Sequence, residues 1–188
     1  MPRCRITSAL ASLTLVLLSV TACGNSNGLP AAGLENAVDT VHLFALDGTP
    51  LTDPSGFNVQ SNAVVRTDQS TGFDFAFNID STGKAVLLPT GALKLGIGSG
   101  IQLQTVSFDA VTSASTATYV DSLPVVVDSG SVVVAHSRAS ACSFGSIVFY
   151  YGKFEVLAID TLARRIDLQV LVDQNCGYRG LSPGFPTN

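Results

Sequence analysis

The chain has 188 residues, with 10 basic and 14 acidic side chains and a formal net charge of −4 at pH 7. Charged residues make up only 13% of it, against roughly 25% in an average soluble domain, so uncharged polar residues and Gly must cover much of the surface. An acidic chain without clusters of Lys or Arg does not match phosphate backbones, which argues against a nucleic-acid partner.

The first 22 residues have the pattern of an export signal. Arg3 and Arg5 supply a positive start, and an uncharged stretch rich in Leu, Ala and Val follows from residue 6 to residue 20. A membrane-spanning helix needs roughly 20 predominantly apolar residues, and this stretch is shorter and diluted by Ser and Thr. We therefore interpret residues 1–22 as a signal peptide that is removed.

The signal ends in Val20-Thr21-Ala22-Cys23, which resembles the lipobox of bacterial lipoproteins. The resemblance implies that Cys23 becomes the first residue of the mature chain and carries a thioether-linked diacylglycerol, usually with a third acyl chain on its amine. Two or three acyl chains anchor a protein stably, so the membrane is an expected partner. Gly24 follows rather than Asp, which in Gram-negative members of the family implies the outer membrane. Plain secretion with an unmodified cysteine is the alternative.

Cleavage before Cys23 leaves 166 residues (188 minus 22), a length typical of one domain. All 14 acidic residues remain while Arg3 and Arg5 are lost, so the mature chain carries 8 minus 14, or −6. Residues 23–36 are rich in Gly, Asn, Ser and Ala and predict a flexible tether. The globular domain is expected over residues 37–188.

The first half of the domain alternates like β-strands. Residues 38–46 predict a strand buried on both faces or nearly so, and Asp47-Gly48 predicts a turn. Shorter strands are expected at 57–59 and 63–65. Residues 73–79 show the cleanest alternation, with four large side chains expected to face the core, and another strand follows at 85–88. The large side chains of that alternation are Phe73, Phe75, Phe77 and Ile79.

The second half continues this pattern. The apolar parity changes between Leu103 and Val106, which predicts a β-bulge near residues 104–105. Val-rich runs at 124–127 and 131–135, joined by Asp-Ser-Gly, predict a hairpin. Residues 147–159 and 165–172 predict a longer pair, the second strand with one buried face. About eight to ten strands without a helical period predict an all-β domain, a single antiparallel β-sandwich or a barrel.

Two cysteines remain in the predicted domain, because Cys4 leaves with the signal and Cys23 is assigned to lipid. Cys142 and Cys176 should therefore form a disulfide in an oxidising compartment. A metal site would need more thiols or imidazoles at matched spacing, and a catalytic cysteine would be unusual outside the cell.

No residues match a catalytic or cofactor-binding motif. His42 and His136 lie within apolar strand patterns, with no nucleophile at a recognisable spacing. Gly98-Ser99-Gly100 lacks the strand-to-helix context of a nucleophile elbow. Oxygen ligands for calcium at Asp47 and Asp53 follow no EF-hand spacing. We expect no enzyme activity, no cofactor and no metal.

The predicted disulfide brings two polar segments together. It draws Arg138 toward Tyr178 and Arg179, and these three residues form a candidate patch for a carboxylate or a sugar. Alternatively, Asp173 pairs with a neighbouring arginine and Tyr178 packs beneath the loop. The sequence thus favours a lipid-anchored envelope domain with a non-catalytic binding or structural role, then a small-molecule binder, and an enzyme last.

Overall fold

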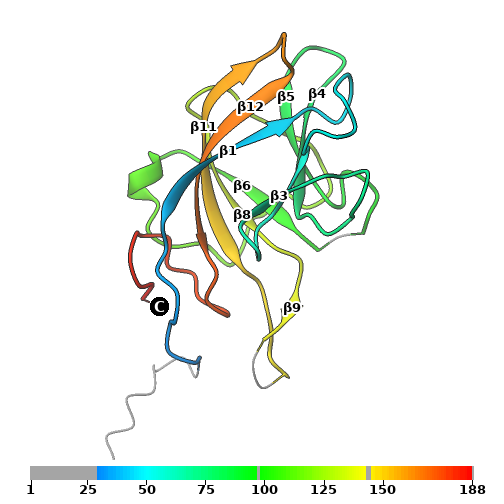
Figure 1. Cartoon of the computed structure of the whole chain (residues 1–188). Helices are drawn as coiled ribbons and strands as arrows, with labels where there is room; N and C mark the ends of the chain where they lie inside the picture. The colour runs from blue at the N-terminus through cyan, green and yellow to red at the C-terminus, as the bar shows by residue number, and fades with distance from the viewer. Residues whose placement is uncertain (1–28, 97, 143–144, 188) are drawn as a thin grey trace, which may run out of the picture.

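The computed structural model describes residues 29–96, 98–142 and 145–187, which form two antiparallel sheets packed face to face (Figure 1). The first sheet contains, in spatial order, β1 (Val38–Phe44), β12 (Arg165–Asp173), β11 (Tyr151–Asp160), β8 (Val132–His136) and β6 (Gly100–Gln104). The second contains β3 (Ala63–Val65), β2 (Gly56–Asn58), β4 (Phe75–Ile79), β5 (Ala85–Pro89) and β7 (Val125–Val126). A separate ribbon pairs β9 (Ser140–Ala141) with β10 (Ile147–Val148). The all-β class is confirmed, and of the two predicted architectures the chain adopts the sandwich.

The core lies between the two sheets, around three phenylalanines. The Phe57 and Phe75 rings of the second sheet stack with centroids 5.6 Å apart, and the Phe154 ring of β11 meets each of them edge-on at 5.1 Å. Edge-to-face contacts of this kind add to the gain from burying the rings. Of the four side chains expected to face the core from residues 73–79, Phe75, Phe77 and Ile79 do so, whereas Phe73 is buried outside this core cluster.

The hairpin of β11 and β12 forms the centre of the first sheet. The two strands pair from Tyr151↔Asp173 to Asp160↔Arg165, with a register shift between Val156 and Ala158. The alternating apolar side chains of the predicted one-face-buried strand, Ile166, Leu168, Val170 and Val172, are buried in the core. Leu171 is buried on the outer face, so this strand is covered on both faces near its end. The long pair is confirmed, although residues 147–148 belong to the separate β9–β10 ribbon.

The first strand is more exposed than its sequence suggested. We predicted burial on nearly both faces, but β1 lies at the edge of its sheet, and of its side chains only Leu43 is fully buried. The inner face of β1 carries the buried Leu43, whereas Val38 on the outer face remains 44% exposed among the described residues.

Two turn predictions in the middle of the chain are wrong. Residues 128–130 do not close a hairpin: β7 pairs with β5 in the second sheet, whereas β8 pairs with β11 and β6 in the first. The turn is therefore a corner between the sheets. The bulge predicted at 104–105 is also wrong, because β6 ends at Gln104 and the chain leaves the sheet there. Leu103, within the strand, and Val106, beyond it, are both exposed.

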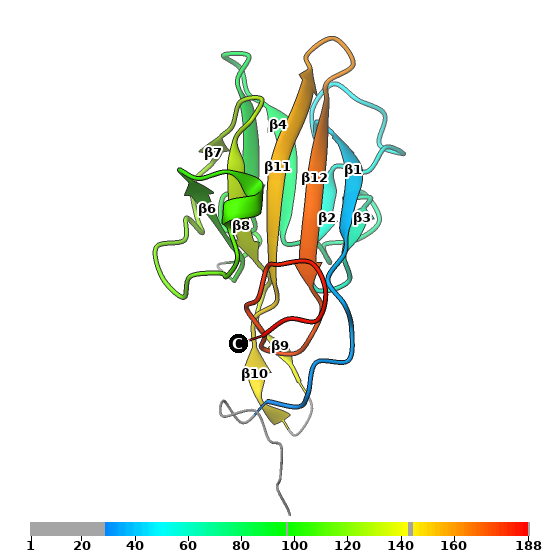
Figure 2. The same ribbon diagram turned by 90° about the vertical axis from the view of Figure 1, so that its left-hand side faces the viewer.

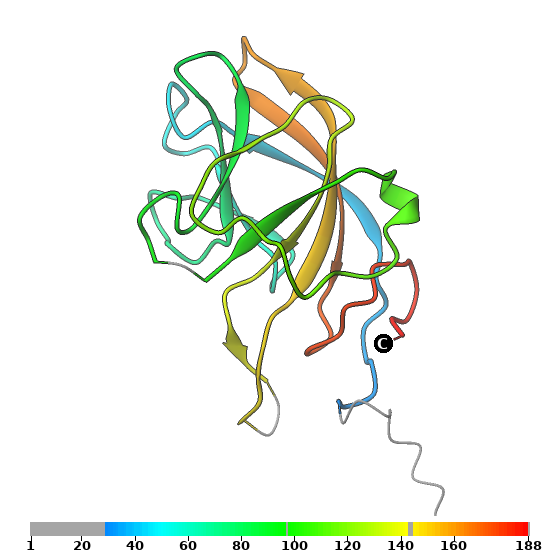
Figure 3. The ribbon, with the colours of Figure 1, turned by 180° about the vertical axis from the view of Figure 1, so that it is seen from behind.

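The departing segment, residues 105–124, builds a second apolar cluster on the outer side of the first sheet (Figure 3). Its short 3-10 helix η1 (Phe108–Ala110) packs with the C-terminal tail over β8, β11 and β12. Lys153 of β11 is buried beneath it, with Nζ donating to the carbonyls of Phe108 (2.8 Å) and Val111 (3.0 Å). The ammonium also lies 4.3 Å from the Phe108 ring centroid, a cation–π contact.

The N-terminal arm, residues 29–36, lies along the C-terminal tail at one end of the sandwich (Figure 2). The amides of Gly33 and Leu34 donate to Asn175 Oδ1 at 2.8 and 2.9 Å. Asn36 is buried and bonds the backbone of Gly184 in both directions. We placed the start of the domain at residue 37; these bonds place it earlier, because Asn175 and Asn36 supply partners for a segment with little apolar content.

Candidate functional site

One pocket is lined by three aromatic rings and lies beside β6 and β8, near the β6 edge of the first sheet. It has a volume of about 350 Å³. We call it the aromatic pocket, and it is lined by Gly98, Ser99, Tyr119, Asp121, His136, Ala139 and Phe149.

Strand pairing places two of these rings in contact. Val120 forms two backbone hydrogen bonds with Ile101 of β6, and so holds Tyr119 over the end of β8. The His136 ring lies edge-on to Tyr119, with centroids 4.6 Å apart. A Cβ at Gly100 would lie 2.7 Å from both His136 Nε2 and Tyr119 Cβ, so the absence of a side chain there allows the rings to approach.

His136 is neutral in this environment. Its Nδ1 lies 2.8 Å from the carbonyl oxygen of Ser137, and because a carbonyl only accepts, we assign the proton to Nδ1. Burial lowers the pKa of His136, while the Ser137 carbonyl and the charges of Asp74 and Asp121 oppose this shift. The ring therefore keeps Nε2 as an acceptor at neutral pH.

A second recess, the polar groove, adjoins the aromatic pocket and shares Ala139 with it. Its volume is about 230 Å³. The residues that line it are Asn58, Gln60, Asp74, Ser137, Arg138, Ala139 and Ser140.

Asp74 is the buried charge of this groove. Its carboxylate accepts from the Val59 amide at 2.7 Å and the Arg138 amide at 2.9 Å, and Arg138 Nε lies 3.6 Å away. Burial raises the pKa of Asp74, against these hydrogen bonds and the arginine charge. The Ser99 hydroxyl donates to the Asp74 carbonyl oxygen, which joins the groove to the neighbouring pocket.

The three residues of the predicted ligand patch occupy different environments. Arg138 lines the polar groove. Tyr178 is only 1% exposed, and its hydroxyl donates to the Pro30 carbonyl at 2.8 Å, so it packs under the N-terminal arm. Arg179 lies near enough to Tyr119 and Tyr151 to lower their pKa values, against the larger effect of burial, which raises both.

The disulfide joins Cys142 to Cys176, with 6.0 Å between the Cα atoms, and so fastens the β9–β10 ribbon to the end of β12. Asp173, for which an arginine pair was the alternative, accepts hydrogen bonds at Oδ1 from the backbone and side chain of Asn175. Cys23 and the predicted signal lie outside the described residues.

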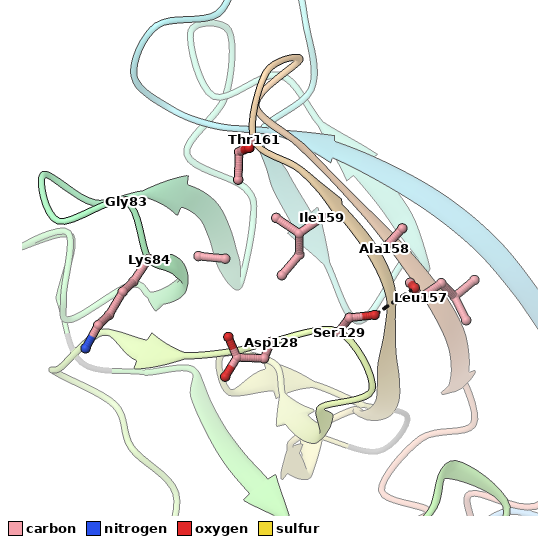
Figure 4. Close-up of a pocket in the computed structure, with 9 residues that line it drawn as sticks. Gly83, Lys84, Asp128, Ser129, Leu157, Ala158, Ile159 and Thr161 are labelled. Atoms are coloured by element: carbon pink, nitrogen blue, oxygen red, sulfur yellow. Dashed lines mark hydrogen bonds between the residues drawn. The ribbon is translucent and has the colours of Figure 1, made fainter.

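A wider pocket of about 490 Å³ lies at the opposite end of the sandwich (Figure 4). The β4–β5 turn, the corner at 128–130 and the end of β11 form its walls. Figure 4 shows that Lys84 extends away from Ile159, and the Ser129 hydroxyl is held by the Leu157 carbonyl at 3.1 Å. No aromatic side chain is among the residues that line this wider pocket, so the aromatic pocket is the better candidate site.

Most of the aromatic pocket was not predicted from the sequence. Tyr119, Asp121 and Phe149 were not singled out, and His136 was interpreted as structural. The available signal was local and concerns Tyr119, a large aromatic residue in a segment made mostly of small and polar side chains.

Among residues 29–96, 98–142 and 145–187, no cluster of three or more His, Cys, Asp or Glu is arranged to hold a metal ion. The same residues include no helix of the length and apolarity needed to cross a membrane. A scan against models of known protein families finds no match to the chain, and a search of curated proteins finds none either.

Proposed function

We propose that this chain is a lipid-anchored lipoprotein of the cell envelope whose domain binds a ligand without chemical conversion. The observation that carries the binding role is the junction of the aromatic pocket and the polar groove at Ala139. Flat rings beside converging polar groups are typical of small-molecule sites. The anchor is Cys23, and in a Gram-negative host Gly24 favours the outer membrane.

Binding suits these side chains better than catalysis does. Ser99, which lines the aromatic pocket, is buried and donates to the Asp74 carbonyl, and it also bonds Thr90. The free nitrogen of His136 faces Gly100, the residue paired with it in β6. A general base needs a nucleophile within reach, and the Ser99 hydroxyl is already bonded to the Asp74 carbonyl and to Thr90.

The charges favour a neutral saccharide over a carboxylate ligand. Asp74 already compensates Arg138, and Asp121 adds a further negative charge beside His136. An anion would meet these two carboxylates. A sugar ring would instead place a C–H face on Tyr119 or Phe149 and direct its hydroxyls to the carboxylate, amide and hydroxyl groups of the groove.

An NMR titration tests the ligand class. The oxidised domain from residue 29 onward is titrated with neutral mono- and oligosaccharides, and with acetate and succinate as anionic competitors. We expect saccharides to shift the signals of Tyr119 and His136, and Phe149→Ala to weaken binding about ten-fold, the equivalent of about 1.4 kcal/mol. Leu157→Ala, at the opposite end, is the matched control and should leave the titration unchanged.

Two results would redirect this proposal. Shifts with the carboxylates alone would favour an anion site at Arg138. A domain that responds to neither class and shows no copurified mass would support a structural role. Acylation is tested separately: the mass of the mature chain should include acyl chains that Cys23→Ser removes.

A further inference from the structure

The chain leaves the described domain at a fixed point beside the disulfide. A Cβ at Gly177 would lie 3.1 Å from the Leu29 side chain and 3.2 Å from that of Val148, so Leu29 packs between the tail and β10. One residue later, Pro30 accepts the hydrogen bond of Tyr178. The exit of the chain is therefore held at the end of the sandwich that carries the β9–β10 ribbon (Figures 1 and 2).

Little chain separates this exit from the proposed lipid. From Cys23 to Leu29 the chain advances six residues, and an extended chain covers at most about 3.6 Å per residue, so the two lie within roughly 22 Å. That bound holds for every conformation of the intervening residues. An acylated Cys23 would keep this end of the domain next to the bilayer.

The same end exposes large apolar side chains from three segments. Leu34 of the N-terminal arm is 53% exposed, Ile147 of β10 is 68% exposed, and Phe185 of the tail is 58% exposed. The arm and tail are joined by the bonds between Asn36 and Gly184, and the ribbon by the disulfide. Apolar and aromatic side chains of this kind favour the interfacial region of a bilayer.

The distribution of charged residues agrees with a lipid-facing role for this end of the domain. The segments 29–36, 139–150 and 174–187 contain only two charged residues, Glu35 and Arg179, in a mature chain of net charge −6. The loops and strand ends at the opposite end of the sandwich contain more charged residues, namely Asp47, Asp53, Asp80, Lys84, Asp128, Asp160, Arg164 and Arg165. An anionic lipid surface repels acidic groups, and these three segments contain one, Glu35.

We propose that this end is a membrane-contact surface, on which Leu34, Ile147 and Phe185 insert into the bilayer interface and hold the domain upright on its anchor. The inference rests on the proposed acylation of Cys23, which brings the surface to the lipid. In this arrangement the exposed apolar side chains contact lipid, and the charged loops of the opposite end point away from the bilayer.

Single-tryptophan variants test the contact, because the chain contains no Trp of its own. Leu34→Trp, Ile147→Trp and Phe185→Trp are made in the full acylated protein, purified from the envelope and reconstituted into vesicles of phosphatidylethanolamine and phosphatidylglycerol. The acyl chains are either plain or brominated, since bromine quenches tryptophan on contact. Leu162→Trp, at a site 97% exposed at the opposite end, is the matched control.

We expect the three variants to emit at shorter wavelength in vesicles and to lose emission in brominated lipid, while Leu162→Trp does neither. Substitution at exposed sites leaves the fold intact, which the disulfide mass and circular dichroism verify. Equal emission of all four variants in both lipids, with acylation confirmed by mass, would overturn the surface and leave the anchor standing. A mature chain without acyl groups would remove the anchor and this surface together.

Discussion

Asn175 holds the N-terminal arm, and its replacement by alanine should release that arm without unfolding the sandwich. The side chain accepts from the amides of Gly33 and Leu34 and donates to the Leu34 carbonyl at 2.8 Å and to Asp173 Oδ1 at 2.9 Å. A typical hydrogen bond contributes about 1 kcal/mol net, so the four together set a gross cost of about 4 kcal/mol.

Part of that cost is recovered when the arm detaches. The arm groups involved are only partly buried, so water replaces their lost partners. Freeing the backbone of two residues returns roughly 2 to 3 kcal/mol of conformational entropy. We therefore expect Asn175→Ala to reduce the free energy of unfolding by about 1 to 2 kcal/mol.

Amide hydrogen exchange and urea unfolding check this expectation together. The Gly33 and Leu34 amides should exchange about ten-fold faster or more, as a change of 1.4 kcal/mol implies, while the amides of β11 change only as much as the global stability. Asn78→Ala removes a comparable side-chain bond, to Asp47 at the opposite end, and should leave arm exchange unaltered. Unchanged protection of Gly33 and Leu34 in Asn175→Ala would refute the assignment of the arm to the domain.

Three further perturbations address the core, the buried acids and the pocket. Phe154→Ala should cost about 3 to 5 kcal/mol in urea unfolding, because it removes the ring that meets both neighbouring phenylalanines, whereas Phe154→Leu should cost less. Burial raises the pKa of Asp173. The contribution of this group to the free energy of unfolding is therefore fully present below its unfolded pKa and is lost as the pH rises through its folded pKa. Asp173→Asn should reduce this loss of stability with pH, and an unchanged dependence of stability on pH would contradict the assignment. Gly100→Ala should cost about 1 to 3 kcal/mol and separate His136 from Tyr119, seen as a change in the His136 ring signals; identical spectra would show that the pair does not depend on Gly100.

The sequence was most informative where one face of a strand is covered along its whole length. In residues 73–79 and 165–172 the alternating apolar side chains from Phe75 onward do belong to the core, although Ala76 and Leu171 on the opposite faces are buried as well. The edge position of β1 and the separation of β7 from β8 could not be read in this way. Both depend on which distant strand supplies the pairing, and a local pattern does not contain that information.

The covering of the outer face of the first sheet could not be predicted from the sequence for the same reason. Lys153 in a strand predicts a solvent-facing position, yet it is buried, because residues 105–124 return over the sheet and present two carbonyls to it. The aromatic pocket also combines a loop, a strand end and the base of a ribbon. The disulfide, predicted from the compartment and the number of cysteines, was the one sequence-based prediction that placed two of these distant segments next to each other.

The path of the arm also has a mechanical consequence. A pull on the N-terminus passes through the bonds between Asn36 and Gly184 and then along β1, which pairs antiparallel with β12 from Val38↔Leu171 to Phe44↔Arg165. In Figure 2 the arm continues the line of β1, so the force runs parallel to the strand. The interstrand bonds are then loaded in shear, all at once, instead of being unzipped one by one. With its far end gripped, the domain would resist traction on its N-terminus through the whole length of its edge strand.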